Sequence, residues 1–207
     1  VEDVTENTGD RDALLAAASA MTLSALGGWQ SADQLPGCAL QGVRCAGIES
    51  EARVSRLLLG RNDLVGTVPS ELGTLAELRV LYLEENRLSG TIPSEIGELV
   101  ELGEIYFHQN KLTGTMPSEL GKLISLFALH LTDNRLDGVI PTELGNMGEL
   151  EELSLGSTRL SATLPTELGA LAKLQRLHLD ATKLTGTIPS ELGALTELLE
   201  LHLDATK

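Results

Sequence analysis

The residues best suited to chemistry in this sequence are its tyrosines and histidines, which recur at a fixed spacing. Both tyrosines and three of the four histidines stand at positions that differ by multiples of 24. These residues are Tyr82, Tyr106, His130, His178 and His202, and the fourth histidine, His108, lies two residues after Tyr106. Aromatic and imidazole side chains stack, form hydrogen bonds and serve recognition well, so the pattern indicates a contact surface.

Acidic residues accompany this pattern. Glu84 follows Tyr82 by two positions, and the tripeptide His-Leu-Asp occurs at His178 and again at His202. Two imidazoles and two carboxylates on neighbouring repeats could hold a divalent metal. Near-identical repeats create such pairs automatically, however, so we expect no metal and no cofactor. The predicted binding residues are Tyr82, Glu84, Tyr106, His108, His130, His178, Asp180 and His202.

Motifs and composition argue against several classes of function. The sequence contains no recognisable nucleophile–base pair, phosphate-binding loop or metal-ligand signature, so we expect a protein that is not an enzyme. Its 30 acidic and 15 basic residues give a net charge of -15, which disfavours nucleic acid and anionic lipid as partners. No apolar run approaches the ~20 residues that span a bilayer, so no membrane insertion is expected.

The spacing of 24 belongs to a repeat that must position these side chains. A motif of the form G-T-I-P-S-E-L-G begins at Gly66, Gly90, Gly114, Gly138, Ala162 and Gly186. Such a period predicts stacked supersecondary units. Leucine pairs such as Leu81 and Leu83 alternate with polar residues, which predicts a strand in each unit. The tyrosines and histidines lie between the two core residues, and therefore on one sheet face, roughly 5 Å apart.

Other repeated residues have structural roles. The proline of each motif precedes an expected short helical turn, and the following glutamate lies near its N-terminus. An asparagine after each early strand, Asn62, Asn86, Asn110 or Asn134, can satisfy backbone groups of its own coil and of the next. Thr158, Thr182 and Thr206 replace it later, so we expect a weaker ladder there.

The full pattern resembles the plant-type leucine-rich repeat, L-x-x-L-x-L-x-x-N-x-L-x-G-x-I-P-x-x-L-G, from about Val54 to Lys207. This family includes receptor-kinase ectodomains, polygalacturonase-inhibitor-like proteins and similar algal proteins. The resemblance implies an α/β fold, a right-handed leucine-rich-repeat solenoid with a parallel concave β-sheet. We expect residues 1–53 to form an N-terminal capping region and residues 54–207 to form six full coils plus a partial seventh.

The segment before the repeats resembles the N-terminal cap of the same family. A helix that opens at Asp10 and ends near Gly27-Gly28 is followed by Trp29 and by Cys38 and Cys45. Leu40 stands where the family often has Trp. The resemblance implies a Cys38–Cys45 disulfide, with two free buried thiols as the alternative, and Trp29 packed on the first coil. A disulfide implies a secreted protein or another oxidising compartment of the secretory pathway.

The resemblance implies recognition of a protein or peptide ligand on the concave face. The alternative is a structural or surface-binding extracellular protein that contacts ice, cell wall or an assembly through regular Ser/Thr or Glu ladders. One hydroxyl ladder contains Thr67, Thr91, Thr115, Thr163 and Thr187, and a second contains Ser89, Thr113, Ser161 and Thr185. The glutamate ladder contains Glu71, Glu95, Glu119, Glu143, Glu167 and Glu191.

The sequence also predicts how the C-terminal end of the array is covered. The repeat stops at Asp204-Ala-Thr-Lys207, after a strand and before its G-x-I-P turn. Leu198, Leu201 and Leu203 would then line an open end beside an unpaired strand edge. We therefore expect end-to-end association at this end, or a longer chain that covers it.

Overall fold

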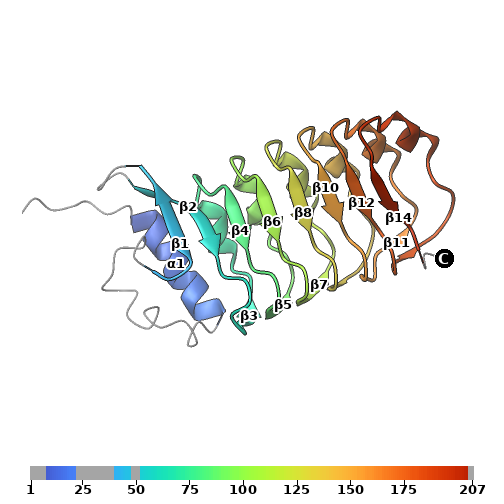
Figure 1. Ribbon diagram of the computed structural model, residues 1–207. Helices are drawn as coiled ribbons and strands as arrows, with labels where there is room; N and C mark the ends of the chain where they lie inside the picture. Colours follow the sequence, from blue (N-terminus) through green and yellow to red (C-terminus); the bar gives the residue numbers. More distant parts are fainter. Residues whose placement is uncertain (1–7, 22–39, 48–51, 205–207) are drawn as a thin grey trace, which may run out of the picture.

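The computed structural model of the protein describes residues 8–21, 40–47 and 52–204 (Figure 1). An N-terminal helix, α1 (Thr8–Ala20), is followed by strand β1 (Val43–Ala46) and then by a regular array of coils. The described chain forms a solenoid with a largely parallel sheet, as the period of 24 predicts.

One strand from each coil contributes to an eight-stranded sheet of order β1-β2-β4-β6-β8-β10-β12-β14. Strand β1 pairs antiparallel with β2, and every later pair in this sheet is parallel. The strands after β1 are β2 (Arg53–Leu58), β4 (Val80–Tyr82), β6 (Glu104–Tyr106), β8 (Ala128–His130), β10 (Glu152–Ser154), β12 (Arg176–His178) and β14 (Glu200–His202). We call the solvent-facing side of this sheet the sheet face; it is the side predicted to be concave.

Two smaller sheets follow the turn that leaves each main strand. Strands β3 (Val65–Thr67), β5 (Arg87–Gly90), β7 (Lys111–Gly114) and β9 (Arg135–Leu136) form one of them. Strands β11 (Ser161–Ala162) and β13 (Lys183–Leu184) form the other. The residues of the hydroxyl ladders lie in these strands or within a few positions after them.

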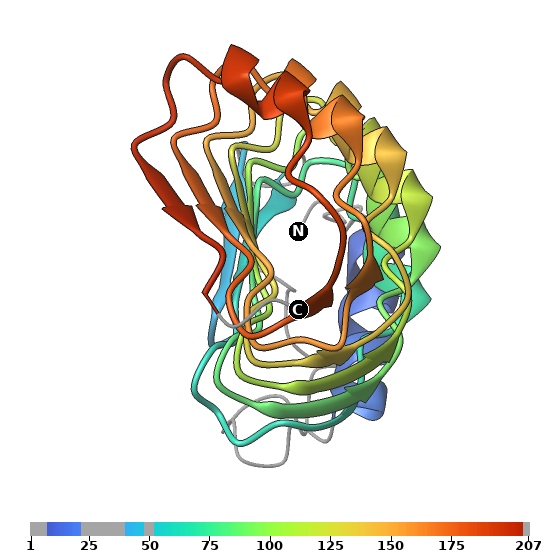
Figure 2. The ribbon, with the colours of Figure 1, turned by 90° about the vertical axis from the view of Figure 1, so that its right-hand side faces the viewer.

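A short 3-10 helix closes each coil on the side opposite the main sheet (Figure 2). The six helices are η5 (Ser70–Thr74), η6 (Ser94–Glu98), η7 (Ser118–Lys122), η8 (Thr142–Asn146), η9 (Thr166–Ala170) and η10 (Ser190–Ala194). Each begins directly after the proline of the motif and has the glutamate as its second residue, as predicted. The fixed φ of proline prepares the chain for the helical turn.

The glycine that ends most motifs lets successive helices pack closely. A Cβ added at Gly121 would lie 2.3 Å from the carbonyl oxygen of Glu143 on the next coil. Gly97 has the same relation to Glu119, also at 2.3 Å. No side chain fits at that distance, so the recurrence of glycine follows from the spacing of the coils.

The core is a continuous column of leucines between the main sheet and the 3-10 helices. Leu81 and Leu83 are fully buried, as is the equivalent pair Leu153 and Leu155, which confirms the predicted alternation. Burial of this apolar surface is the main stabilising term of the fold.

Buried asparagines join the coils at the point where the chain leaves each main strand. The Asn110 side chain donates to the Leu83 carbonyl of the preceding coil at 2.9 Å and accepts from the Leu88 amide at 2.9 Å. The inter-coil bonds therefore run to the preceding coil, not to the next one as predicted. Thr182 donates only to the carbonyl of Leu179 in its own coil, at 2.9 Å, which confirms the weaker ladder of the later coils.

The N-terminal helix is tied to the first coil by a buried acid. The Asp10 carboxylate accepts bonds from Arg53 Nη2 at 2.8 Å and from the Val54 amide at 2.8 Å. Helix α1 ends at Ala20, before the predicted end near Gly27-Gly28. Trp29 and Cys38 lie outside the described residues, so the disulfide to Cys45 and the packing of Trp29 stay predictions.

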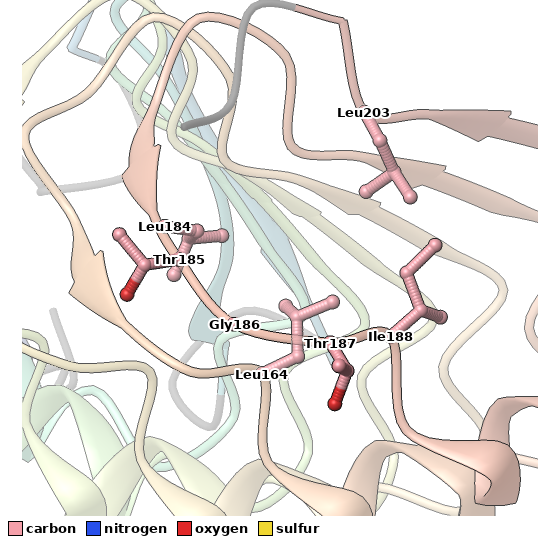
Figure 3. Close-up of a pocket in the computed structure, with 7 residues that line it drawn as sticks. All are labelled: Leu164, Leu184, Thr185, Gly186, Thr187, Ile188 and Leu203. Carbon is pink, nitrogen blue, oxygen red and sulfur yellow. The ribbon is translucent and has the colours of Figure 1, made fainter.

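The apolar interior is exposed at the last described coil. The exposed fraction is 42% for Leu201, whereas its counterpart Leu177 is fully buried, and it is 58% for Ile188 against 2% for Ile140. A small cavity of about 40 Å³ lies between Leu164, Leu184, Thr185, Gly186, Thr187, Ile188 and Leu203 (Figure 3). Association through this end stays a prediction.

Candidate binding surface on the sheet face

The parallel register brings the predicted tyrosines and histidines into one column. Strand pairing aligns Leu58 with Tyr82, Tyr82 with Tyr106, and Tyr106 with His130. The column continues from His130 to Ser154, from Ser154 to His178, and from His178 to His202. Apolar residues on both sides of each of these positions, leucines except for Ile105 and Phe107 beside Tyr106, belong to the core side of the strand, so the column itself lies on the solvent side.

Four of these side chains form an aromatic cluster: Tyr82, Tyr106, His108 and His130. The ring centroids of Tyr82 and Tyr106 lie 4.7 Å apart in an edge-to-face arrangement, and those of Tyr106 and His130 lie 4.4 Å apart. His108 completes the group, with its ring centroid 6.0 Å from Tyr106 and 6.2 Å from His130. All four side chains are half-buried. Such a cluster offers a partner rigid apolar area together with polar edges.

Three residues of the column contact a carboxylate, and in each case the carboxylate belongs to the next coil and is offset along the strand. The Tyr82 hydroxyl donates to Glu104, and His130 Nε2 lies 2.8 Å from Glu152 Oε2. His178 Nε2 lies 3.3 Å from Glu200 Oε2. The sequence prediction missed these three glutamates. Each stands two positions before a residue of the column, and the alternation of side chains along a strand places both on the same face.

Glu152 is the centre of a charged network beside the aromatic cluster. It accepts hydrogen bonds from Arg176 as well as from His130. Burial opposes charge on Glu152, but the bonds from Arg176 and His130 outweigh it and lower the pKa of the carboxyl group. Burial lowers the pKa of His130, although the hydrogen bond to Glu152 acts in the opposite direction. His130 is therefore neutral at neutral pH and presents a hydrogen-bonding ring.

The two tyrosines differ in their hydroxyl partners. Burial raises the pKa of both Tyr82 and Tyr106, and nearby carboxylates add to the effect, so both phenols stay protonated. Tyr82 has Glu104 as its acceptor, whereas the equivalent position beside Tyr106 is Ala128, which has no acceptor side chain. Of the two tyrosine hydroxyls, that of Tyr106 is therefore the one that can donate a hydrogen bond to a ligand.

The two predicted acidic residues lie outside the column. The carboxylate of Glu84 covers Gly60 on the preceding coil, within 2.1 Å of where a Cβ would stand, and Asp180 covers Gly156 in the same way. These carboxylates fill the space that the glycines leave. Glu84 Oε2 and His108 Nδ1 are buried and have no hydrogen-bond partner among the described residues. Unpaired buried polar atoms are uncommon in proteins, and they occur preferentially at functional sites.

The structure brings His178 and His202 together, but Asp180 does not join them. Their ring centroids are 4.5 Å apart, and the carboxylate beside them belongs to Glu200. Ser154 separates this pair from the aromatic cluster and lies 3.5 Å from His178 Nδ1. The predicted tyrosines and histidines therefore form two groups on the sheet face.

The second hydroxyl ladder bonds neighbouring coils together, whereas the threonines of the first ladder are exposed. In the second ladder, Ser89 Oγ donates to the Gly66 carbonyl at 3.1 Å and Thr113 Oγ1 donates to the Gly90 carbonyl at 3.3 Å. In the first ladder, the Thr91 methyl group packs against Gly114 of the next coil. That ladder is interrupted by Val139, which is 54% exposed.

Comparison with known proteins assigns the class of this chain. The Leucine Rich Repeat family profile matches residues 77–99, 125–147 and 173–195. One chain of the BIR3–SERK2 complex from Arabidopsis thaliana is 33% identical, with a TM-score of 0.69, and the match covers 91% of this chain and 98% of that one. The chain belongs to the plant-type leucine-rich-repeat proteins. No curated protein sequence matches it.

Two further solved structures are similar to the chain. The leucine-rich-repeat ectodomain of the Arabidopsis receptor kinase HAESA, in complex with a peptide hormone ligand, is 30% identical with a TM-score of 0.83. That match covers 95% of this chain but 33% of the receptor chain, so this chain spans about a third of its length. A plant ice-binding protein is 28% identical with a TM-score of 0.81, and the match covers 91% of this chain and 60% of that one.

No helix in the described part of the chain is long and apolar enough to cross a membrane.

Proposed function

We propose that this chain is a non-enzymatic recognition module that binds a peptide or protein segment across the sheet face, centred on the aromatic cluster. The observation that carries the proposal is the cluster itself, in which four aromatic or imidazole rings contact one another on a half-exposed surface. The repeat does not require these residue types at this position, because Leu58 and Ser154 occupy it in other coils. Clustered, partly buried aromatic side chains are typical of binding hot spots.

Charge supports a particular kind of partner. The aromatic cluster is bordered by Glu104 and Glu152, and the chain as a whole has a net charge of -15. A peptide that carries basic side chains would be attracted to this surface, while the Tyr106 hydroxyl would donate to a backbone carbonyl of the peptide. The HAESA ectodomain, which resembles this chain, is in complex with a peptide ligand.

The same relatives support an extracellular site of action. The HAESA structure is a receptor-kinase ectodomain, and the cysteines of this chain stand in the segment that resembles the family's cap. We propose that the chain acts outside the cell or in the secretory pathway, with Cys38 and Cys45 joined in the cap.

The alternative function is contact with an extended surface such as ice through the hydroxyl ladders. The similarity to a plant ice-binding protein supports this alternative. Ice binding requires a flat, regular array of available groups. Here Ser89 and Thr113 donate to backbone carbonyls, and Val139 interrupts the outer ladder. These contacts favour the sheet face as the functional surface.

The proposal is tested by selecting peptides from a random display library on the full 207-residue chain. Affinities of selected peptides are then measured by calorimetry for the wild type and for the double variant Tyr82→Ala/Tyr106→Ala. We expect an affinity loss of at least about 30-fold, because removal of hot-spot aromatic residues costs about 2 kcal/mol or more.

The matched control is Thr91→Ala/Thr115→Ala on the outer hydroxyl ladder, with folding of all variants checked by circular dichroism. The control should bind the selected peptides with wild-type affinity. Peptides that bind the tyrosine variant as well as they bind the wild type would place the site elsewhere. Thermal hysteresis that is present in the wild type and lost in the threonine variant would establish the ice-contact alternative instead.

A further inference from the structure

The second group on the sheet face consists of two imidazoles and one carboxylate from adjacent strands. Strands β12 and β14 pair in parallel, which aligns Arg176 with Glu200 and His178 with His202. One ligand atom from each of His178, Glu200 and His202 lies within 4.8 Å of the others. These three residues form the only such His/Cys/Asp/Glu group found in the described part of the chain.

The separation of these groups suits a shared cation. His178 Nε2 and Glu200 Oε2 are 3.3 Å apart. Two ligands of a tetrahedral Zn²⁺, each bound at about 2.0–2.2 Å, are separated by roughly the same distance. The ring of His202 lies beside that of His178, with centroids 4.5 Å apart and planes inclined by 42°, and its ligand nitrogen lies within 4.8 Å of the other two ligand atoms.

A neighbouring side chain orients the first histidine. Ser154 Oγ lies 3.5 Å from His178 Nδ1, on the side of the ring away from Glu200. A partner on one ring nitrogen fixes the orientation of the imidazole and leaves the other nitrogen for a metal. Ser154 is 5% exposed and therefore firmly placed in the sheet.

The surrounding charges leave the carboxylate available. Arg176 stands beside Glu200 in the sheet and interacts with it electrostatically, but it donates its hydrogen bond to Glu152 on the preceding coil. Asp180 packs over Gly156 and is not one of the three clustered ligand residues. The Glu200 side chain is 49% exposed and that of His178 is 28% exposed, so a cation can reach both from solvent.

We propose that His178, His202 and Glu200 bind one divalent transition-metal ion, Zn²⁺ in preference, on the sheet face. Two imidazole nitrogens and one carboxylate oxygen suit Zn²⁺, whereas Ca²⁺ and Mg²⁺ require sites built from oxygen. Three protein ligands leave a fourth position open for water or for a group of a bound partner. The metal would thus add a Lewis-acidic contact to the same surface as the aromatic cluster.

His130 provides an internal comparison within the same column. It also faces a glutamate, Glu152, at 2.8 Å. Its neighbour on the next coil is Ser154, not a second histidine, and Glu152 is also bonded to Arg176. His130 therefore has no imidazole at the aligned position of the next coil and no unshared carboxylate, and it is the matched control for the proposed site.

The test uses the full chain, metal-free buffer at pH 7.5 and ZnCl₂ alone as the probe. Calorimetric titration and equilibrium dialysis with elemental analysis give the affinity and the number of ions bound. We expect one Zn²⁺ per chain, at least tenfold weaker binding in His178→Ala, His202→Ala and Glu200→Gln, and unchanged binding in His130→Ala.

Several results would overturn the proposal. These are the absence of Zn²⁺ binding at micromolar concentrations, equal binding by His202→Ala and the wild type, or an equal loss in His130→Ala. Circular dichroism of each variant separates loss of the site from loss of the fold, and a histidine-to-alanine variant that unfolds is replaced by the histidine-to-glutamine substitution. Loss of Zn²⁺ binding without any change in peptide affinity would leave the proposed peptide function standing on its own.

Discussion

The sheet face and the side that carries the hydroxyl ladders come from the same repeat, yet their residues are used differently. On the ladder side, equivalent positions hold nearly the same residues in every coil, and the side chains bond or pack against the neighbouring coil. On the sheet face, the solvent-facing column changes from Leu58 to tyrosine, histidine and serine. Positions that the stacking of coils requires are therefore uniform, and positions that it leaves open carry the chemical variety.

In a repeat protein, the recurrence of a residue among the coils therefore helps to distinguish a structural role from a functional one. A residue that recurs in every coil, such as the glycine or proline of the motif, is explained by contacts between coils. A residue that recurs in only some coils and faces solvent, such as Tyr106, has no such explanation. The comparison makes three quantitative predictions about which changes affect stability.

The largest effect is expected for Gly121→Ala in η7. The new Cβ would lie 2.3 Å from the carbonyl oxygen of Glu143, so the two coils would have to move apart. We expect a decrease of about 1–3 kcal/mol in the free energy of unfolding, the usual cost of overpacking, measured by urea denaturation. Gly148→Ala is the matched control, because nothing lies within 4 Å of its added Cβ. Equal stability of the two variants would contradict close packing of the 3-10 helices.

A smaller effect is expected for Thr113→Val on the second hydroxyl ladder. The change removes the bond from Thr113 Oγ1 to the Gly90 carbonyl, at 3.3 Å, while keeping the shape of the side chain. We expect a loss of about 1 kcal/mol, typical of one hydrogen bond, with no change in the affinity of peptides selected on the sheet face. A loss of peptide affinity without a loss of stability would mean that the ladder, not the sheet face, is functional.

The smallest effect is expected from the pH dependence of His130. Its pKa is lowered in the folded state by burial, so the unfolded chain binds more protons below its ordinary pKa of about 6.5. The contribution of His130 to stability is complete above that pH and is lost as the pH falls through the folded pKa. We expect a change of less than about 1 kcal/mol, since one unit of pKa corresponds to about 1.4 kcal/mol.

The measurement compares urea denaturation of the wild type and of His130→Gln between pH 7.5 and pH 5. The variant should show a shallower decrease in stability over this range. Identical curves would show that burial does not disfavour the charged imidazole. Because the pKa of His130 is lowered, any change in peptide affinity that depends on its protonation should occur at a pH below the usual pKa of histidine.

The features of the fold that could be predicted from the sequence are those that depend on residue spacing alone. The period of 24, the alternating leucines and the prolines predicted the sheet, the helical turns and the column from Tyr82 to His202. The direction of the asparagine bonds was predicted wrongly, because spacing does not say which neighbouring coil an amide reaches. Helix α1 ends at Ala20, earlier than predicted, because it lies outside the repeat and no recurring spacing fixes its end.

The sequence by itself determined the solenoid and the residues that share its solvent-facing column, because in a regular parallel stack equal spacing means equal position. Only the tertiary structure decided which of these residues act together. Glu84 and Asp180 turn into the space left by glycines, while Glu104, Glu152 and Glu200 reach the column diagonally. The physical reason is that such contacts depend on the stagger between coils and on side-chain rotamers, and neither is encoded in the distance between two letters of the sequence.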